Sequence, residues 1–497
     1  MNAGVSEVVL RFRQRTPDRT AIDLGDSTIS YGELGRMVDH LASRLRAEIT
    51  DPSELLLLAT ENEAALLVGA LAAGAARRTF AVVRRAMPEA LVRKQFARLK
   101  PGLLLTGFPG AWLPDLKRIK LDLLAIRKLA AESPSQRAGC EAPAEAEREV
   151  DSAPFCIIVG SGSTGTPKLF EISQAGEVLN LRQRIEAFSL SPDDQVASLI
   201  QSEFTSSWRL LAAGLAAGAM LRLHPRSAPS WMDELMSSEV SILLAPVVGL
   251  HSMLQRYGGL GRVLPSLRRI ATVGSDVSED LRHQIHERLT PSLHVIYATN
   301  EMGYFCIAGP DDWLNAPGTV GRLLPGLEME VVDQQGDPVQ AGEPGLLRFR
   351  KPHMPIGYIG NPEMTRRHFK EGWFYPGDVG RIDAEGRLIL LGRADDMMIY
   401  NGINIYPSEI ESTLRKFPGV RDVAAVLCVT RSTRRCQSVQ SCWTRKRRRA
   451  RTRFAQGRAT CRAAPRLRSS SSSNNCPATP RANCCAHSCA RCSLNSG

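Results

Sequence analysis

Apolar and polar residues alternate along the first third of the chain in two different rhythms. Short apolar runs at 21–24, 27–31 and 54–60 have the length and composition of strands. The segment 32–47 instead places its apolar residues at helical spacing, and the apolar stretch that ends near Ala76 is a second helix. This succession of strand and helix is typical of a mixed α/β fold with largely buried sheets.

The middle of the chain continues in the same way, with strands expected at 241–248, 269–273 and 294–297. From about residue 318 to residue 391, short strands alternate with glycine turns, which is typical of a small β-barrel or an antiparallel sheet. We therefore expect an N-terminal α/β domain over residues 1–392 that includes this β-rich part.

A smaller α+β unit is expected to follow at 393–430, with a helix at 407–416 and a strand at 420–430. Beyond that strand the pattern of apolar and polar residues stops. Residues 431–497 contain 16 Lys and Arg residues and no Asp or Glu, and eight of the chain's 12 cysteines lie there. We expect this tail not to fold, because it has little apolar surface to bury.

The formal net charge of +12 on the 497 residues is distributed unevenly along the chain. The first 430 residues carry 47 basic and 51 acidic side chains, so the basic excess belongs to the tail alone. Four scattered cysteines in this body indicate a reduced, cytoplasmic protein rather than a disulfide framework. The sequence begins without a typical leader, and no apolar run is long enough to span a membrane.

The most informative segment is a buried strand, 155–159, followed by the flap Gly160-Ser-Gly-Ser-Thr-Gly-Thr-Pro-Lys168. Backbone N–H groups of such a loop, with its hydroxyls and its lysine, can surround a phosphate. A P-loop would continue into a helix, but residues 169–173 alternate like a strand. The segment therefore predicts a strand–flap–strand, and a Ser/Gly-rich linker is the alternative.

Two later segments carry polar groups at strand ends or turns. Tyr297-Ala-Thr-Asn-Glu301 follows a buried strand, and its hydroxyl and carboxylate suit a phosphate and its Mg²⁺. Gly372-Trp-Phe-Tyr-Pro-Gly-Asp378 ends in a carboxylate that can accept hydrogen bonds from ribose hydroxyls. Arg393 and Asp395 come after the next pair of expected strands. Each segment alone could equally be a turn cap or a surface ion pair.

Taken together and in this order, the segments resemble the adenylate-forming superfamily of acyl-CoA synthetases, AMP–acid ligases and adenylation domains. The resemblance covers about residues 20–430. The matching segments are Ser30-Tyr-Gly-Glu-Leu34, Ser161–Lys168, Tyr297–Glu301, Gly318-Thr-Val-Gly-Arg322, Gly357-Tyr-Ile-Gly-Asn-Pro-Glu363, Gly372–Asp378, Gly392-Arg-Ala-Asp-Asp396 and Asn401-Gly-Ile-Asn-Ile-Tyr-Pro-Ser-Glu-Ile-Glu411.

The resemblance implies ATP-dependent activation of a carboxylic acid to an acyl-adenylate, followed by transfer to the thiol of coenzyme A. The catalytic residues implied are Thr164 and Lys168, which would contact the β- and γ-phosphates, and Glu301, which would hold Mg²⁺. Thr299 would touch the α-phosphate. The nucleotide- and cofactor-binding residues implied in this way are Ser161, Gly162, Ser163, Gly165, Thr166, Tyr297, Thr299, Asp378, Arg393 and Gly402.

Within that set, the resemblance assigns further roles around the ribose and the C-terminal lid. Asp378 would accept from the ribose hydroxyls, with Arg393 beside it. Asp395 would be the hinge about which the lid, which starts at 393, moves between the half-reactions. Gly402 would line the channel for the pantetheine arm of coenzyme A.

The sequence departs from the family pattern at two places that affect function. Amino-acid-activating members have an aspartate where this chain has Thr205, so an amino acid substrate is disfavoured and an acid with a neutral tail is favoured. The family's lid also ends in a lysine within a Gly-Lys pair, whereas Lys446, among arginines, is the only lysine after residue 430. Candidate acid-pocket residues lie at 204–208, with Trp208 limiting the depth if it points inward, at 273–275 and at Ala298.

The tail admits three interpretations. Its abrupt start in mid-domain favours out-of-frame translation of a GC-rich gene, whereas its basic residues could contact RNA, and Cys485, His487, Cys489 and Cys492 could bind zinc. We expect no nucleic acid partner. The functions that stay open beside a fatty- or aryl-acid–CoA ligase are an enzyme loading the phosphopantetheine of an acyl or peptidyl carrier protein, an impaired remnant that only binds ATP, and an RNA-binding protein.

Overall fold

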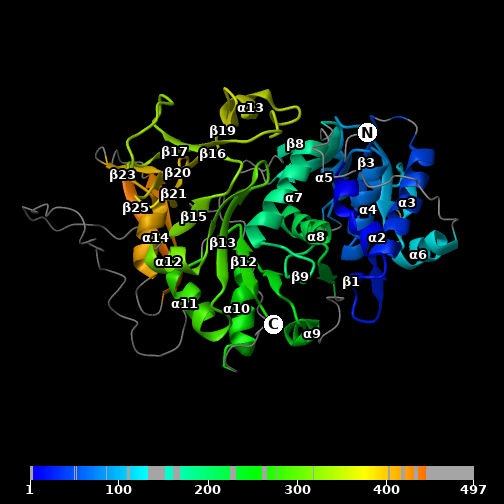
Figure 1. Ribbon diagram of the computed structural model, residues 1–497. Helices are drawn as coiled ribbons and strands as arrows, with labels where there is room; N and C mark the ends of the chain where they lie inside the picture. The colour runs from blue at the N-terminus through cyan, green and yellow to red at the C-terminus, as the bar shows by residue number, and fades with distance from the viewer. Residues whose placement is uncertain are drawn as a thin grey trace, which may run out of the picture. The chain divides into compact units, whose positions relative to one another are not determined.

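The computed structural model describes most of the chain. The described residues are 4–49, 51, 53–84, 87–108, 112–132, 152–160, 168–223, 231–259, 266–275, 277–316, 318–400, 403–415, 420–429 and 435–443. Backbone contacts group residues 1–442 into one compact unit (Figure 1). No described helix combines the length and the apolar character needed to cross a bilayer.

The first sheet is largely parallel and carries the predicted flap at one edge. Among the described residues its strands, in spatial order, are β6 (Lys117–Lys120), β5 (Pro101–Thr106), β3 (Leu55–Ala59), β4 (Phe80–Val82), β7 (Pro154–Gly160) and β8 (Lys168–Ser173). Only β8 is antiparallel to its neighbour. All five residues of β3 are buried, which explains its continuous run of leucine.

A second, larger sheet combines a parallel half and an antiparallel half. Across the described part of the chain its path is β18 (Phe369–Lys370), β19 (Trp373–Phe374), β17 (Gly345–Arg350), β20 (Asp378–Ile382), β21 (Arg387–Arg393), β15 (Thr319–Leu323), β14 (Gly303–Ala308), β13 (Leu293–Thr299), β12 (Arg269–Val273), β11 (Ile242–Leu244), β9 (Gln195–Ser198), β10 (Met220–Arg222), β1 (Thr20–Asp23) and β2 (Thr28–Ser30), with β16 (Glu328–Val332) paired to β17. The strands from β1 to β13 in this path are parallel, and those from β13 to β19 are antiparallel.

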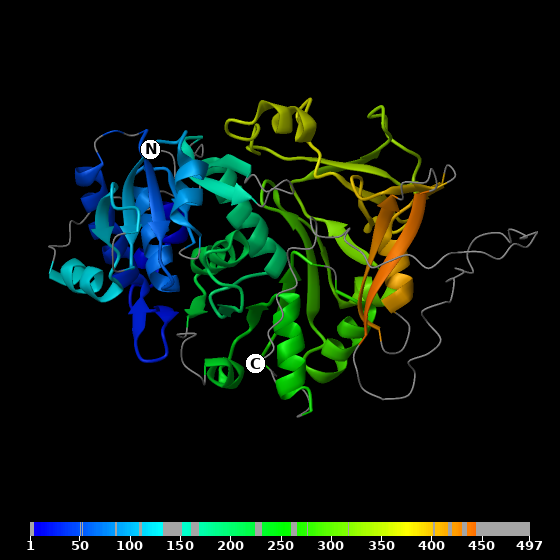
Figure 2. The ribbon, with the colours of Figure 1, turned by 180° about the vertical axis from the view of Figure 1, so that it is seen from behind.

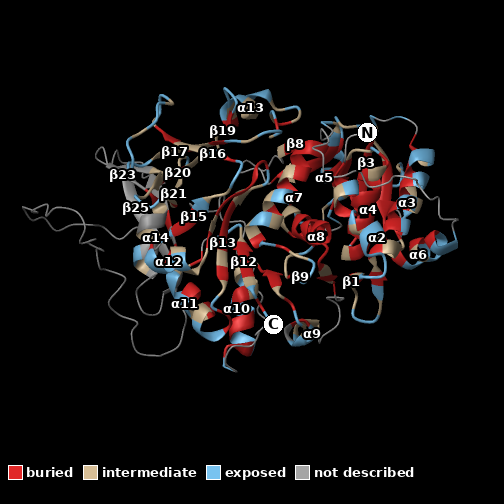
Figure 3. Cartoon of the chain, in the orientation of Figure 1, coloured by how far each residue is buried: buried red, intermediate tan, exposed pale blue. Residues whose placement is uncertain are grey.

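Helices pack on both sheets, as the alternating pattern predicts. The helices described are α1 (Val5–Val9), α2 (Phe12–Arg15), α3 (Tyr31–Glu48), α4 (Glu63–Ala75), α5 (Glu89–Phe96), α6 (Leu123–Glu132), α7 (Gln174–Phe188), α8 (Thr205–Ala217), α9 (Trp231–Ser237), α10 (Val247–Tyr257), α11 (Glu279–Arg288), α12 (Pro310–Asn315), α13 (Pro362–His368) and α14 (Pro407–Arg415). Helices α7 and α8 pack on each other; α7 contacts β7 and β8 of the first sheet, and α8 contacts β9 and β10 of the second. Both helices therefore lie at the junction of the two sheets (Figure 1), and α8 is almost entirely buried there (Figure 3).

Two strand expectations need correction. The strand expected at 241–248 ends at Leu244, because Pro246 is the N-cap of α10. The β-rich part at 318–391 is not a separate barrel: β15 pairs with β14, so its strands continue the large sheet in antiparallel fashion. Gly321 permits that pairing, because at its φ of +89° a Cβ would come 1.9 Å from the carbonyl oxygen of Ile307.

The last part of the unit contains two two-stranded sheets. Strands β22 (Met398–Tyr400) and β23 (Ile403–Ile405) form an antiparallel pair, and β24 (Val420–Val429) and β25 (Arg435–Trp443) form the other sheet beside α14 (Figure 2). Strand β25 lies within residues 431–497, so the expectation that this tail does not fold is wrong for residues 435–443. Pairing with β24, rather than the composition of the segment, defines the strand. Residues 444–497, with the candidate zinc ligands, lie outside the described residues.

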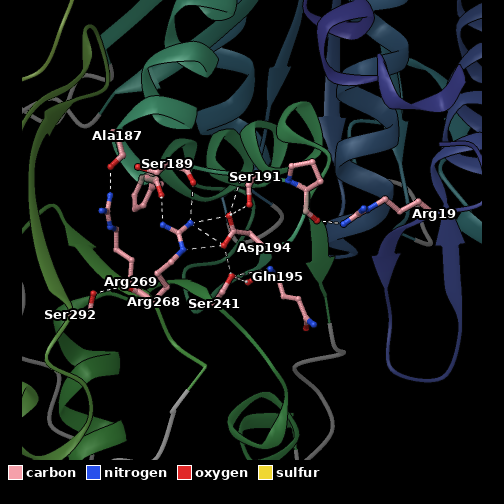
Figure 4. Close-up of polar contacts among 12 residues, drawn as sticks. Arg19, Ala187, Ser189, Ser191, Asp194, Gln195, Ser241, Arg268, Arg269 and Ser292 are labelled. Carbon is pink, nitrogen blue, oxygen red and sulfur yellow. Dashed lines mark hydrogen bonds and ion pairs between the residues drawn. The ribbon is translucent and has the colours of Figure 1, made fainter. Parts of the chain in front are cut away.

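A polar cluster around Asp194 ties the loop after α7 to the large sheet (Figure 4). The Asp194 carboxylate accepts hydrogen bonds from Ser241 Oγ at 2.7 Å and from Arg268 Nη2 at 2.9 Å. Arg268 also donates to the carbonyl of Ser189, which ends α7 in the left-handed conformation. Burial alone would raise the pKa of Asp194, but these donors hold it below its ordinary value. Both carboxylate oxygens of Asp194 accept hydrogen bonds from described residues, so we interpret the cluster as structural.

Candidate active site

The predicted strand–flap–strand is confirmed by the pairing of β7 with β8. The two strands are antiparallel, and Gly160 lies directly opposite Lys168. The flap residues between them, with Ser161, Gly162, Ser163, Thr164, Gly165 and Thr166, lie outside the described residues. The flanking strands therefore place both ends of the flap at one point, and a helix does not follow Lys168 directly as it would in a P-loop.

Both ends of the flap open onto a cavity of about 520 Å³. Gly160 and Lys168 line it on one side. The residues predicted from the other segments and found in the same lining are Thr299, Glu301 and Arg393. Segments separated by more than 200 positions in the chain therefore meet around one space, as the nucleotide hypothesis requires.

Asp378 lies beside this cavity, held by two donors. Tyr297, at the end of β13, donates its hydroxyl to Asp378 Oδ2 at 2.5 Å, and Arg393 Nη1 donates to Oδ1 at 3.1 Å. Arg393 also donates to the carbonyl of Pro376 at 2.7 Å. Burial and the adjacent carboxylate raise the pKa of Tyr297 well above its ordinary value, so the tyrosine stays a donor. Arg393 and Pro376 line the cavity, and Asp378 stands directly behind them.

Glu301 sits deeper in the lining, with only 8% of its surface exposed. Its carboxylate accepts a hydrogen bond from Tyr358 Oη at 2.7 Å, and Lys168 Nζ lies 5.3 Å from the centre of the Tyr358 ring. Burial lowers the pKa of Lys168, an effect that Glu301 partly offsets. The described residues contain no group of three or more His, Cys, Asp or Glu side chains placed to hold a metal ion.

Asp395 contacts two arginines next to the cavity. Its carboxylate lies 3.2 Å from Arg367 and 3.8 Å from Arg393, and both arginines are substantially exposed. Asp395 lies two residues after Arg393, the last residue of β21. Its role as a hinge stays a prediction. Gly402 lies outside the described residues.

The candidate acid-pocket residues divide into two groups. Phe204, Thr205, Val273 and Ala298 line the cavity. Trp208 does not: it is 3% exposed, and its ring packs against those of Phe80 and Phe155 in the core. The expectation that Trp208 could set the depth of the pocket is therefore wrong, because it faces the first sheet.

Two buried arginines in the cavity lining were missed by the sequence reasoning. Arg184 on α7 is 2% exposed, and Arg209 on α8 is 1% exposed. Arg209 pairs with Glu177 at 2.7 Å, and Arg184 lies over the ring of Tyr304 at 4.3 Å from its centre. A signal was present, since Arg209 is the one charged residue among the 13 of α8, a helix that is otherwise apolar or hydroxylic.

The nucleotide and acid sides of the cavity meet on one strand. Tyr297 holds Asp378, while the next two residues of β13, Ala298 and Thr299, line the cavity. The turn that follows leads to Gly303, the first residue of β14, which has a φ of +77°. The next residue, Tyr304, lines the cavity. This one continuous segment could thus position a reacting carboxylate next to a bound phosphate.

Comparison with known proteins agrees with this geometry. The profile of the family described as "AMP-binding enzyme" matches residues 10–359. Indoleacetate–CoA ligase from Aromatoleum aromaticum is 28% identical over 435 residues, which cover 85% of this chain and 84% of that protein. Feruloyl-CoA synthase from Amycolatopsis sp. is 26% identical over 434 residues, covering 86% of each.

Solved structures share the fold. MatB from Rhodopseudomonas palustris with bound ATP superposes with a TM-score of 0.77 at 22% identity, covering 89% of this chain and 88% of that one. O-succinylbenzoate CoA synthetase (MenE) from Bacillus subtilis, in complex with its acyl-adenylate intermediate, gives 0.74 at 21% identity, covering 88% and 87%. The predicted α/β fold with large mixed sheets is therefore confirmed, and the chain belongs to the AMP-binding enzyme family, whose members are ATP-dependent, AMP-forming ligases.

Proposed function

We propose that this chain is an aryl-acid–CoA ligase. In the first half-reaction a substrate carboxylate oxygen attacks the α-phosphorus of ATP, the bond to the β-phosphate oxygen breaks, and pyrophosphate leaves. In the second, the thiolate of coenzyme A attacks the acyl carbon and AMP leaves with the bonding electron pair. The observation that carries the proposal is that Lys168, Thr299, Glu301 and Arg393 line a single cavity.

The protein's contribution to the first step is positioning and neutralisation of charge. Lys168 and, from the flap, Thr164 contact the outer phosphates, and Thr299 contacts the α-phosphate. Glu301 holds Mg²⁺, which when bound supplies positive charge to the phosphate oxygens. Asp378 accepts from the ribose hydroxyls; in support, it contacts the cavity-lining Arg393 through Oδ1 and is held in place by Tyr297 through Oδ2.

An aryl acid fits better than a fatty acid. Two relatives over most of the chain are named for indoleacetate and ferulate, both aryl acids. A long alkyl tail needs an apolar tunnel, whereas the lining here includes the buried guanidinium groups of Arg184 and Arg209. Coenzyme A is the proposed acceptor because these relatives are named as a CoA ligase and a CoA synthase. A carrier-protein phosphopantetheine is the alternative, and an assay with each acceptor distinguishes the two.

The lid determines how fast this chain works. We propose that Asp395 is the hinge, that Gly402 belongs to the thiol channel, and that the lid starts near residue 393. Lys446, in an arginine run, is the only lysine after residue 430, so the lysine that bridges carboxylate and α-phosphate in the family has no counterpart here. Loss of one such contact in the transition state costs about 10²- to 10³-fold in rate.

The test separates nucleotide binding from turnover. We expect the 497-residue chain to bind ATP with Mg²⁺ in a calorimetric titration, and to catalyse acid-dependent ATP–pyrophosphate exchange about 10²- to 10³-fold more slowly than indoleacetate–CoA ligase assayed in parallel with its own acid. Glu301→Gln should abolish the Mg²⁺ dependence of ATP binding, with the exposed Glu363→Gln as the matched control. Absence of ATP binding would refute the proposed function, and exchange at the full rate would refute the importance of the missing lysine.

A further inference from the structure

The cavity has a cationic end that is distinct from its nucleotide end. Arg184 and Arg209 line it from the adjacent helices α7 and α8, and both are almost completely buried. Arg209 pairs with Glu177 at 2.7 Å, and the Arg184 guanidinium lies 4.3 Å from the centre of the Tyr304 ring. Glu301 and Lys168 instead contact Tyr358. The arginine end therefore has its own set of contacts among the described residues.

This environment contains more positive than negative charge. Glu177, which is fully buried, pairs with Arg209 at 2.7 Å and also accepts from Asn180 Nδ2 at 3.1 Å. Arg184 finds no carboxylate of its own among the described residues near it: its Nη1 donates to the carbonyl of Asn180 at 2.8 Å, and the guanidinium stacks over Tyr304. Burial lowers the pKa of Arg184 and Arg209 adds to that effect, whereas Tyr304 and Glu177 oppose it.

Donor groups at this end also stay unused within the described protein. The Nε atoms of Arg184 and Arg209 are both buried and have no hydrogen-bond partner there. A buried guanidinium with an unfilled donor and no full counter-ion is costly, typically several kcal/mol. Such an arrangement in a cavity wall is expected where a ligand supplies the missing acceptor and the missing charge.

We propose that the acid substrate carries a second anionic group, a carboxylate, which binds to Arg184 and Arg209 where α7 and α8 line the cavity. This inference rests on the proposed function and specifies its substrate as a dicarboxylic aryl acid. One carboxylate reacts at the α-phosphorus; the other neutralises the arginine pair. The expectation of a neutral tail, drawn from Thr205, is thereby revised, while the exclusion of an ammonium-bearing substrate is strengthened by two like charges.

Binding of acyl-sulfamoyl adenosines tests the second carboxylate. These compounds mimic the acyl-adenylate and do not react, so the test needs no catalytic step from the lid. The set consists of the benzoyl compound and its ortho, meta and para derivatives carrying a carboxylate, the corresponding carboxamide, or an aminomethyl group. We expect at least one carboxylate derivative to bind at least about tenfold more tightly than its own carboxamide, the effect of one charge-assisted contact. The aminomethyl compounds should bind more weakly than the benzoyl compound.

Substitution of the unpaired arginine tests the assignment to this end of the cavity. Arg184→Met should lose the preference for carboxylate over carboxamide, and Arg184→Lys should restore part of the preference. Arg182→Met, an exposed position two residues earlier on α7, is the matched control and should change neither. Removing an uncompensated buried charge should leave the melting temperature equal or higher.

The outcomes distinguish the two claims. If none of the compounds binds, the proposed function fails, and this inference fails with it. If the benzoyl compound binds but no carboxylate derivative exceeds its carboxamide, the function stands and the second carboxylate is refuted. If Arg184→Met weakens all compounds equally, the guanidinium serves the nucleotide or the fold, and the assignment is also refuted.

Discussion

Asp378→Asn isolates the charge of the proposed ribose-binding residue from its packing. The asparagine amide has the same shape as the carboxylate. Its carbonyl oxygen can accept from Arg393, and its NH₂ group can donate to the Tyr297 hydroxyl, so both neighbours keep a partner. The fold should therefore survive the change, and the loss should fall on hydrogen bonds from the ribose to a charged acceptor.

The magnitude follows from the number of such bonds at stake. A hydrogen bond to a charged group contributes about 1.5–3 kcal/mol, and the substitution removes the charge from one such contact while keeping an acceptor. The Asp378 side chain is 16% exposed, so water compensates little. We expect the dissociation constant for ATP to rise about ten- to a hundredfold, since about 1.4 kcal/mol corresponds to a factor of ten.

Isothermal titration of ATP into the 497-residue chain measures this directly and needs no turnover. Asp396→Asn is the control, because it makes the same chemical change at an exposed aspartate a few residues beyond Arg393. A dissociation constant for Asp378→Asn within twofold of the unmodified chain would refute the ribose role. An equal loss in both variants would point to net charge rather than to the site.

Two further predictions concern the buried ionisable residues Glu177, Arg209 and Lys351. Glu177→Gln leaves Arg209 buried without its ion-pair partner, so the free energy of unfolding should fall by about 3–5 kcal/mol, measured by urea denaturation; a loss below 1 kcal/mol would show that the pair is dispensable. Burial, reinforced by Arg184 and Arg209, lowers the pKa of Lys351 to about 7. The unfolded chain then binds the extra proton between pH 7 and about pH 10, so stability relative to Lys351→Met should increase with pH across that window, by up to about 1.4 kcal/mol per pH unit, and be flat below it. Parallel curves for the two proteins in denaturant titrations at pH 6 and pH 9 would contradict the lowered pKa.

Part of the cavity lining was predictable because its residues are local in sequence. Lys168, Thr299, Glu301 and Arg393 each belong to a short segment of recognisable chemistry next to a strand. Their convergence on one cavity did not follow from the alternating pattern, because Lys168 begins β8 of the first sheet whereas Thr299 and Arg393 end strands of the second; only the family resemblance implied it.

The acid side was not predictable to the same degree, because it depends on which way a buried helix is rotated. Trp208 and Arg209 are neighbours on α8, yet one packs into the aromatic core and the other lines the cavity. Successive helical residues point about 100° apart, and a helix buried on nearly all sides has no polar stripe to fix its orientation from sequence. Strand β25 was missed for a related reason: pairing with β24, rather than its own composition, defines it.

Strand β13 and the helices α7 and α8 contribute different residues to the cavity lining, and this has an evolutionary consequence. One strand carries both the tyrosine that donates to Asp378 and two residues that line the cavity, so a substitution that shifts this strand should disturb both together. Arg184 and Arg209 reach the same cavity from helices outside that strand. With the roles proposed above, descendants of this protein could exchange one acid for another by altering two helical positions without altering β13.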